Sequence, residues 1–119
     1  MRKDLEILLQ KAESADAETQ YRLACMYELG IGVEHDKEEA FKWYRKAAEK
    51  GDPEAQYNLG LMYEFGTVVK PDDEEAVKWF KKAAEQGHPD AQQSLLDMDD
   101  PDVQFLLHEM RKEDLKGGE

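Results

Sequence analysis

The chain has a single cysteine, Cys25, and no long apolar segment among its 119 residues. One cysteine excludes an intramolecular disulfide. No run of residues approaches the roughly 18 apolar positions that a membrane-spanning helix needs. The N-terminal segment starts with basic residues, but Asp4, Glu6, Gln10 and Lys11 interrupt its apolar positions, so it is not predicted to be a secretory signal. We expect a protein of a reducing compartment, most simply the cytoplasm.

Basic residues are also scarce. The chain has 16 Lys and Arg against 28 Asp and Glu, which gives a formal net charge of −12. Nucleic-acid binders derive most of their affinity from Lys and Arg on phosphates, and anionic membranes attract basic segments. The charge therefore disfavours both ligands and favours a protein or peptide partner with basic and apolar side chains.

What the chain does contain is an internal repeat. An offset of 36 aligns residues 19–54 with residues 55–90 without a gap, and twenty of the 36 positions are identical. Repeats of this length are typical of solenoids, in which each unit stacks on its neighbour. We expect one domain over residues 1–119.

Each unit contains residues that typically mark the ends of two helices. Asp36 and Asp72 precede the second helices as N-caps, and Gly51 and Gly87 follow them. The second helix has one apolar stripe at helical spacing, formed in the first unit by Ala40, Trp43, Tyr44, Ala47 and Ala48. These features predict an all-α protein in which the stripe faces the core.

The first helix of each unit carries apolar groups on two faces. Ala55, Leu59, Met62 and Tyr63 form a core stripe, whereas Glu54, Tyr57, Leu61, Glu64 and Phe65 lie on the opposite side. Such a helix is either sandwiched or lines a surface that something else covers. We predict a binding groove on this side, lined by Tyr21, Cys25, Glu28, Tyr57, Leu61 and Glu64.

Two segments of the repeat resemble a known protein family. The first is the run Ala55-Gln56-Tyr57-Asn58-Leu59-Gly60-Leu61-Met62-Tyr63, and the second is the run Ala40-Phe41-Lys42-Trp43-Tyr44-Arg45-Lys46-Ala47-Ala48-Glu49. Both are similar to the Sel-one-like repeat family, which is related to the tetratricopeptide repeats. The resemblance implies a short right-handed α–α superhelix. It also implies a non-catalytic protein–protein interaction module, such as an adaptor, scaffold or assembly factor.

On this basis we divide the chain into an N-terminal half-repeat or cap helix (1–15), two full repeats (19–54 and 55–90), a partial repeat (91–98) and a C-terminal cap helix (100–115). The C-terminal helix either covers the open end of the stack or forms a docking surface. Tyr21 and Tyr57 either contact a ligand or pack between neighbouring helices.

No residue set indicates catalysis, a cofactor or a metal. His35, His88 and His108 are not spaced as ligands, and the acidic cluster near residues 97–102 lacks the ligand pattern of a calcium loop. An acidic inhibitor or immunity-type protein that blocks a basic surface of an enzyme or toxin is the alternative function. The sequence leaves open whether the protein is a monomer or a dimer.

Overall fold

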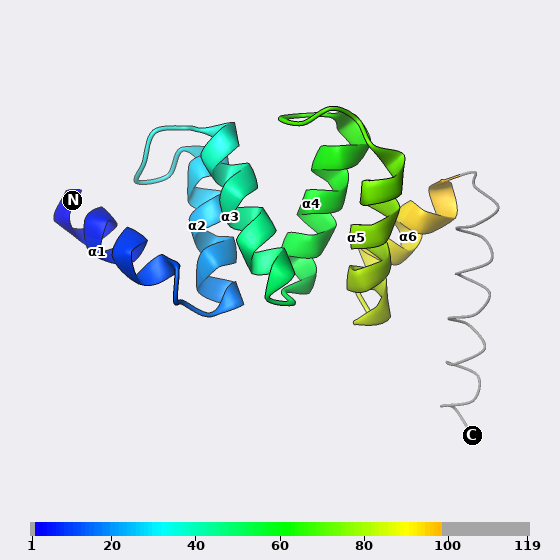
Figure 1. Cartoon of the computed structure of the whole chain (residues 1–119), viewed down its shortest axis with the longest axis horizontal. Helices are drawn as coiled ribbons and strands as arrows, with labels where there is room; N and C mark the ends of the chain where they lie inside the picture. The colour runs from blue at the N-terminus through cyan, green and yellow to red at the C-terminus, as the bar shows by residue number, and fades with distance from the viewer. Residues whose placement is uncertain (1, 99–119) are drawn as a thin grey trace, which may run out of the picture.

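The computed structural model describes residues 2–98, and within that range the chain forms six helices and no strand. The helices are α1 (Arg2–Ala12), α2 (Ala17–Leu29), α3 (Lys37–Glu49), α4 (Pro53–Phe65), α5 (Asp73–Glu85) and α6 (Pro89–Asp97). Figure 1 shows α2 to α5 standing side by side in chain order, with α1 and α6 at the two ends of the row. This is the all-helical solenoid predicted from the repeat. The predicted cap helix over 100–115 lies outside the described residues.

The helices begin where the sequence predicts. Asp36 and Asp72 adopt extended backbone and accept hydrogen bonds from backbone N–H groups of the first turns of α3 and α5. Asp52 caps α4 in the same way, with Pro53 as the first helical residue. At the equivalent position before α6, the ring nitrogen Nδ1 of His88 accepts from the Ala91 N–H at 3.1 Å. His88 is therefore a structural cap, which explains its burial.

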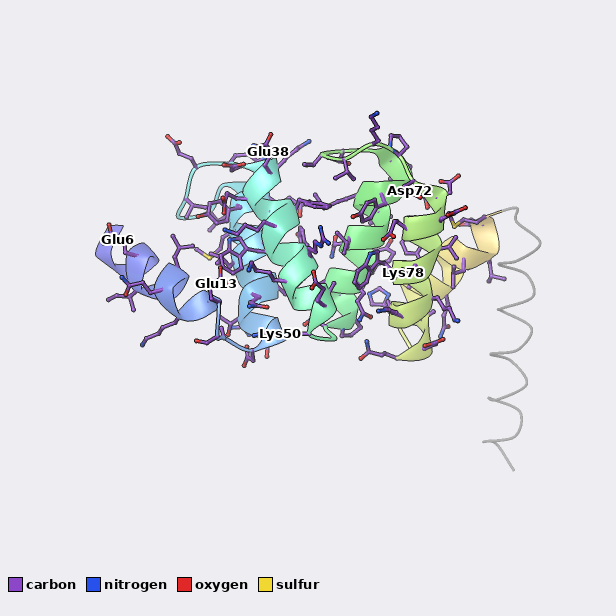
Figure 2. All side chains as sticks on the ribbon, viewed as in Figure 1. Glu6, Glu13, Glu38, Lys50, Asp72 and Lys78 are labelled. Atoms are coloured by element: carbon purple, nitrogen blue, oxygen red, sulfur yellow. The ribbon has the colours of Figure 1, made fainter. Side chains whose placement is uncertain are left out.

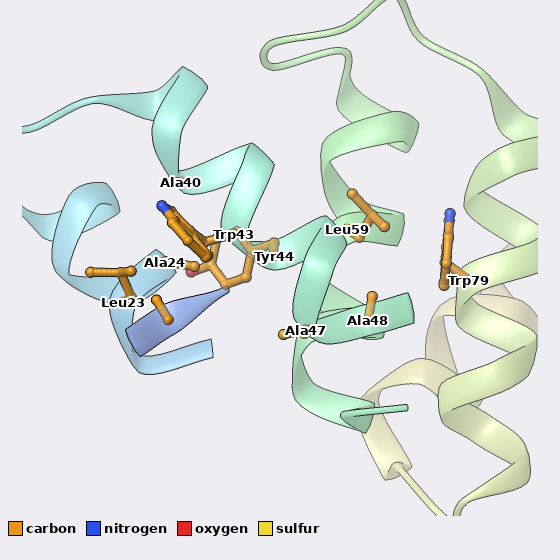
Figure 3. Close-up of a cluster of buried hydrophobic side chains, with 11 residues drawn as sticks. Leu23, Ala24, Ala40, Trp43, Tyr44, Ala47, Ala48, Leu59 and Trp79 are labelled. Atoms are coloured by element: carbon orange, nitrogen blue, oxygen red, sulfur yellow. The ribbon is translucent and has the colours of Figure 1, made fainter. Parts of the chain in front are cut away.

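The second helices bury the predicted stripe. Trp43 and Tyr44 of α3 are buried in a core shared with α1, α2 and α4, among alanines that let the neighbouring helices come close (Figure 3). In the second unit Trp79 and Phe80 take the same places on α5. The core is therefore built layer by layer, with one aromatic pair in each repeat.

The first helices are buried over more of their circumference than the predicted core stripe alone. Besides Ala55 and Leu59, the side chain of Gln56 and the backbone at Gly60 are buried in α4. A Cβ atom at Gly60 would lie 2.6 Å from Cε1 of Phe80. Since α4 contacts α3 before it and α5 after it, the helix is sandwiched, and Gly60 lets the Phe80 ring approach its backbone closely.

A glutamine joins each first helix to the second helix before it. Nε2 of Gln20 donates to the Ala12 carbonyl at 2.6 Å, and Gln56 and Gln92 make the same bond to Ala48 and Ala84 at 3.2 and 3.1 Å. The acceptors are carbonyls in the last turns of α1, α3 and α5, and each also accepts a hydrogen bond from a backbone N–H just after its helix, at Ala15, Gly51 or Gly87. We call this contact the glutamine clasp; it recurs at every junction between units in the described chain.

Two further contacts attach α1 to the stack. Nζ of Lys46 on α3 lies 2.7 Å from Oε2 of Glu13, which follows α1, and its hydrogen bond lowers the pKa of Glu13. Lys50 donates to the Ala15 carbonyl where the end of α3 meets the start of α2 (Figure 2). Ala12 is buried in the same core as residues of α2 and α3, so the end of α1 packs against the first repeat.

Candidate protein-interaction site

A pocket of about 260 Å³ opens between the two full repeats. Its lining comes from α2 and α3 on one side and from α4 and the loop after it on the other: Glu28, Lys37, Ala40, Tyr44, Asn58, Leu61, Met62, Phe65 and Thr67. The floor is mainly apolar, whereas Glu28 and Lys37 add one charge of each sign. Concave, mostly apolar sites with a few polar groups are the usual form of a binding site.

A large apolar side chain is exposed beside this pocket. Phe65, which ends α4 and lines the pocket, is 70% exposed. Leu29 holds the equivalent position at the end of α2 and is 68% exposed, but it does not line the pocket. Exposed apolar side chains next to a hollow are typical of surfaces that bind another protein.

The predicted groove residues of the first repeat, Tyr21, Cys25 and Glu28, surround Tyr44. The ring of Tyr21 lies 5.9 Å from that of Tyr44, Sγ of Cys25 lies 3.6 Å from its hydroxyl, and the hydroxyl donates to the carboxylate of Glu28. Burial, together with the hydrogen bond to Glu28, raises the pKa of Tyr44. The phenol therefore stays protonated and holds Glu28 at the rim of the pocket.

Of the predicted groove residues in the second repeat, Tyr57 packs against neighbouring helices, whereas Leu61 also lines the pocket. Tyr57 stacks on the ring of His88, with centroids 4.7 Å apart and an angle of 25°, and lies 5.8 Å from the ring of Phe80. Leu61 packs beside it against the core of α5 and α6, and it also lines the pocket. Tyr57 is thus engaged by neighbouring elements, and Leu61 is the apolar residue of this pair that lines the pocket.

Glu64, unlike its equivalent Glu28, does not line the pocket. Partial burial raises the pKa of Glu64, and the charges of Asp73 on α5 and Asp97 on α6 raise it further. Glu64 is the equivalent of Glu28, but Phe80 stands where Tyr44 stands and has no hydroxyl to donate.

Seven pocket residues were absent from the predicted groove: Lys37, Ala40, Tyr44, Asn58, Met62, Phe65 and Thr67. The helical wheel places Phe65 on the same side as Leu61, so its position was a usable signal. The other six enter the pocket because α3, α4 and the following loop pack together, which periodicity along one helix does not report.

Residues 2–98 contain neither a metal site nor a membrane span. No group of three or more His, Cys, Asp or Glu side chains in this range is arranged to hold a metal ion. None of the six described helices has the length and apolar character required to cross a bilayer.

The antiparallel helix pairs, repeated every 36 residues and stacked through buried aromatics, define a helical-repeat α-solenoid. The family profile described as Sel1 repeat matches residues 17–52 and 53–88, which together are more than half of the chain. The chain therefore belongs to the Sel1 repeat family, in agreement with the resemblance found in the sequence. Sel1 repeats are in general protein–protein interaction modules, and the proteins that carry them are typically non-catalytic.

Solved structures of family members agree with the fold. A Sel1 repeat protein from Oxalobacter formigenes is 41% identical and superposes with a TM-score of 0.68, over 76% of this chain and 68% of that one. The c5321 protein, a protective antigen present in uropathogenic Escherichia coli strains, is 46% identical with a TM-score of 0.70. That match covers 76% of this chain but only 20% of the antigen. No curated protein matches the chain.

Proposed function

We propose that this chain is a non-catalytic adaptor or scaffold that binds a partner segment on the face formed by α2 and α4. The observation that carries the proposal is the pocket between the repeats, with Phe65 exposed at its edge. The predicted groove residues Glu28 and Leu61 line that pocket, so the face selected from the sequence includes an opening of suitable chemistry. Burying an exposed aromatic side chain is a common source of affinity at protein interfaces.

Phe65 is a cleaner probe of this face than Tyr57. Tyr57 contacts His88 and Phe80, so its removal would disturb the packing of α4, α5 and α6. Phe65 is largely exposed, and Phe65→Asp should leave the fold intact while placing a charge beside the pocket. Leu29→Asp is the matched control because it makes the same change at the equivalent, equally exposed position of the first repeat.

The test is quantitative affinity capture from cells of the source organism with the full chain as bait. We expect Phe65→Asp to lower recovery of the specific partner by about tenfold or more, in line with loss of an aromatic anchor. Leu29→Asp should retain that partner, and circular dichroism should show equal helix content for both variants. Equal recovery with wild type and Phe65→Asp would contradict binding at this face.

A further inference from the structure

A second hollow, of about 570 Å³, lies at the N-terminal side of the first repeat. It is bounded by the ends of α1 and α2, by the loop between α2 and α3, and by the first half of α3. Its apolar part is formed by Leu9, Tyr27, Val33 and Trp43. We call this hollow the N-terminal cavity. It shares no lining residue with the pocket between the repeats, so a ligand bound here is bound independently.

The remaining lining of the N-terminal cavity is mostly acidic. Against the single base Lys42 it has four carboxylates: Glu13, Glu34, Asp36 and Glu39. Glu13 is neutralised by Nζ of Lys46 at 2.7 Å, but no salt bridge within residues 2–98 reaches the other three. Nζ of Lys42 lies 5.2 Å from the centroid of the Trp43 ring instead. The cavity therefore carries an excess of negative charge.

An unused hydrogen-bond donor stands in the wall of the same cavity. Trp43 is only 2% exposed, and its indole Nε1 has no hydrogen-bond partner among the described residues. Figure 3 shows this nitrogen directed away from α4, toward the side on which the chain enters α3 from the preceding loop. That loop supplies Val33 and Glu34 to the cavity. Because a buried donor without a partner is unfavourable, a ligand that offers an oxygen acceptor here gains a hydrogen bond.

The second repeat carries its own bases at the corresponding positions. Arg45 stands where Leu9 stands in the preceding unit, and Lys70 stands where Glu34 stands. The tyrosine, the tryptophan, the capping aspartate and the glutamate three residues after it are the same in both repeats. The first repeat therefore keeps the carboxylates of the motif but lacks the two cations that accompany them one unit later.

We propose that the N-terminal cavity binds an arginine side chain of a partner protein. The guanidinium pairs with the carboxylates of Glu34 and Glu39, and the aliphatic stem packs on Leu9 and Val33. A backbone carbonyl of the same segment accepts from the Trp43 N–H. Arginine suits this lining because its planar fork donates to two carboxylates at once while its stem is apolar. The net charge of −12 attracts the same cationic segment at longer range.

The indole N–H groups report occupancy directly. The full chain, labelled with ¹⁵N, gives one indole resonance each for Trp43 and Trp79, and Trp79→Phe assigns them. The ligands are a five-residue peptide with a central arginine flanked by glycine and serine, and its match with citrulline, the neutral analogue of the same shape. The arginine peptide should shift the Trp43 resonance, leave that of Trp79 in place, and half-saturate at about tenfold lower concentration than the citrulline peptide. Equal responses to the two peptides, equal shifts of both indoles, or no shift would overturn the inference.

Two charge variants separate a local effect from a general one. Glu34→Lys installs the base of the second repeat and should reduce the preference for arginine over citrulline to about twofold or less. Glu38→Lys makes the same change of net charge at an exposed position outside the cavity and should keep most of the preference. An equal loss in both variants would show that net charge alone attracts the peptide and would overturn the assigned site.

A third variant supplies the cation from within the chain. Leu9→Arg copies Arg45 of the next unit and should weaken binding of the arginine peptide by about tenfold, with unchanged helix content by circular dichroism. Undiminished binding to a folded Leu9→Arg chain would contradict the site. Phe65→Asp should leave the Trp43 shift unaltered, because Phe65 lines only the pocket between the repeats. Loss of the shift in that variant would refute a separate cavity.

Other occupants of the cavity are distinguishable outcomes. If light scattering showed a dimer that Glu34→Lys dissociates, an arginine of a second copy would fill the cavity, and the inference would be wrong. If Arg111→Ser moved the Trp43 resonance in the absence of peptide, the chain's own C-terminal segment would fill it, and the inference would again be wrong.

Discussion

Equivalent glutamates of the two repeats lie in different surroundings. Glu28 accepts a hydrogen bond from the Tyr44 hydroxyl, whereas Phe80, at the position equivalent to Tyr44, has no hydroxyl to offer Glu64. Partial burial and the charges of Asp73 and Asp97 all disfavour ionisation, which is why the pKa of Glu64 is raised. The surroundings of Glu64 therefore disfavour its ionised form.

The raised pKa has a stability consequence of defined sign. Because the folded chain holds the Glu64 proton more tightly than the unfolded chain does, the associated stability is fully present below the unfolded pKa and is lost as pH rises through the folded pKa. We expect Glu64→Gln to increase the free energy of unfolding at pH 7, with little change at pH 4. Urea denaturation at the two pH values measures both quantities.

The matched control for Glu64 is Glu28→Gln. It replaces an ionised acceptor of the Tyr44 hydroxyl with a neutral one and should lower stability at pH 7, by about 0.5–1 kcal/mol. A stabilising effect of both substitutions would mean that general relief of negative charge, and not the local environment of Glu64, is responsible.

At the scale of the helix, we expect the glutamine clasp to contribute substantially to the stability of the junction between repeats. Gln56 is buried, donates to the Ala48 carbonyl and accepts from Nε2 of Gln86 at 2.9 Å. Gln56→Met keeps the side-chain length but leaves the carbonyl and the Gln86 amide without this partner. We expect a loss of about 1–3 kcal/mol in the free energy of unfolding, measured by urea denaturation.

At the junction between α1 and α2, a substitution should add a hydrogen bond instead of removing one. Oε1 of Gln20 is buried and has no hydrogen-bond partner within the described residues, because Lys50 stands where Gln86 stands one repeat later. Lys50→Gln places an amide where Gln86 donates to Gln56, so it should stabilise the chain by about 0.5–1.5 kcal/mol. No gain from Lys50→Gln would contradict the equivalence of the two junctions.

The elements themselves could be predicted from sequence because their signals are local. Asp36, Asp72 and Gly51 mark ends, and the stripe through Trp43 marks the buried face of α3. The burial of Gln56 and Gly60 in α4 was missed because the core stripe was assigned from apolar side chains, and neither a glutamine nor a glycine marks such a stripe. The repetition of Gln20, Gln56 and Gln92 was a usable signal, whereas the pocket depends on how α2, α3 and α4 sit together, which no single segment encodes.

For the whole molecule, the excess of 28 acidic over 16 basic residues sets the response to salt. Like charges repel in the compact state, and raising NaCl from about 10 to 150 mM shortens the screening length from about 30 to 8 Å. We expect the melting temperature to rise by about 2–5 °C, measured by circular dichroism or calorimetry.

A charge-reduced variant is the control for the salt response. Glu34→Lys, Glu38→Lys and Glu74→Lys change three exposed positions and reduce the formal net charge from −12 to −6. The increase in melting temperature should shrink accordingly. An undiminished increase would indicate that the salt acts by a route other than screening.

The glutamine clasp also bears on how such a chain can change its length. Each clasp uses only a side chain of one hairpin and a carbonyl eight residues earlier, so a copy of residues 55–90 inserted in tandem brings every partner it needs. In-frame duplications or deletions of 36 codons should therefore yield folded proteins, whereas insertions of other lengths within a hairpin should not. Relatives of widely different size would be expected from such events.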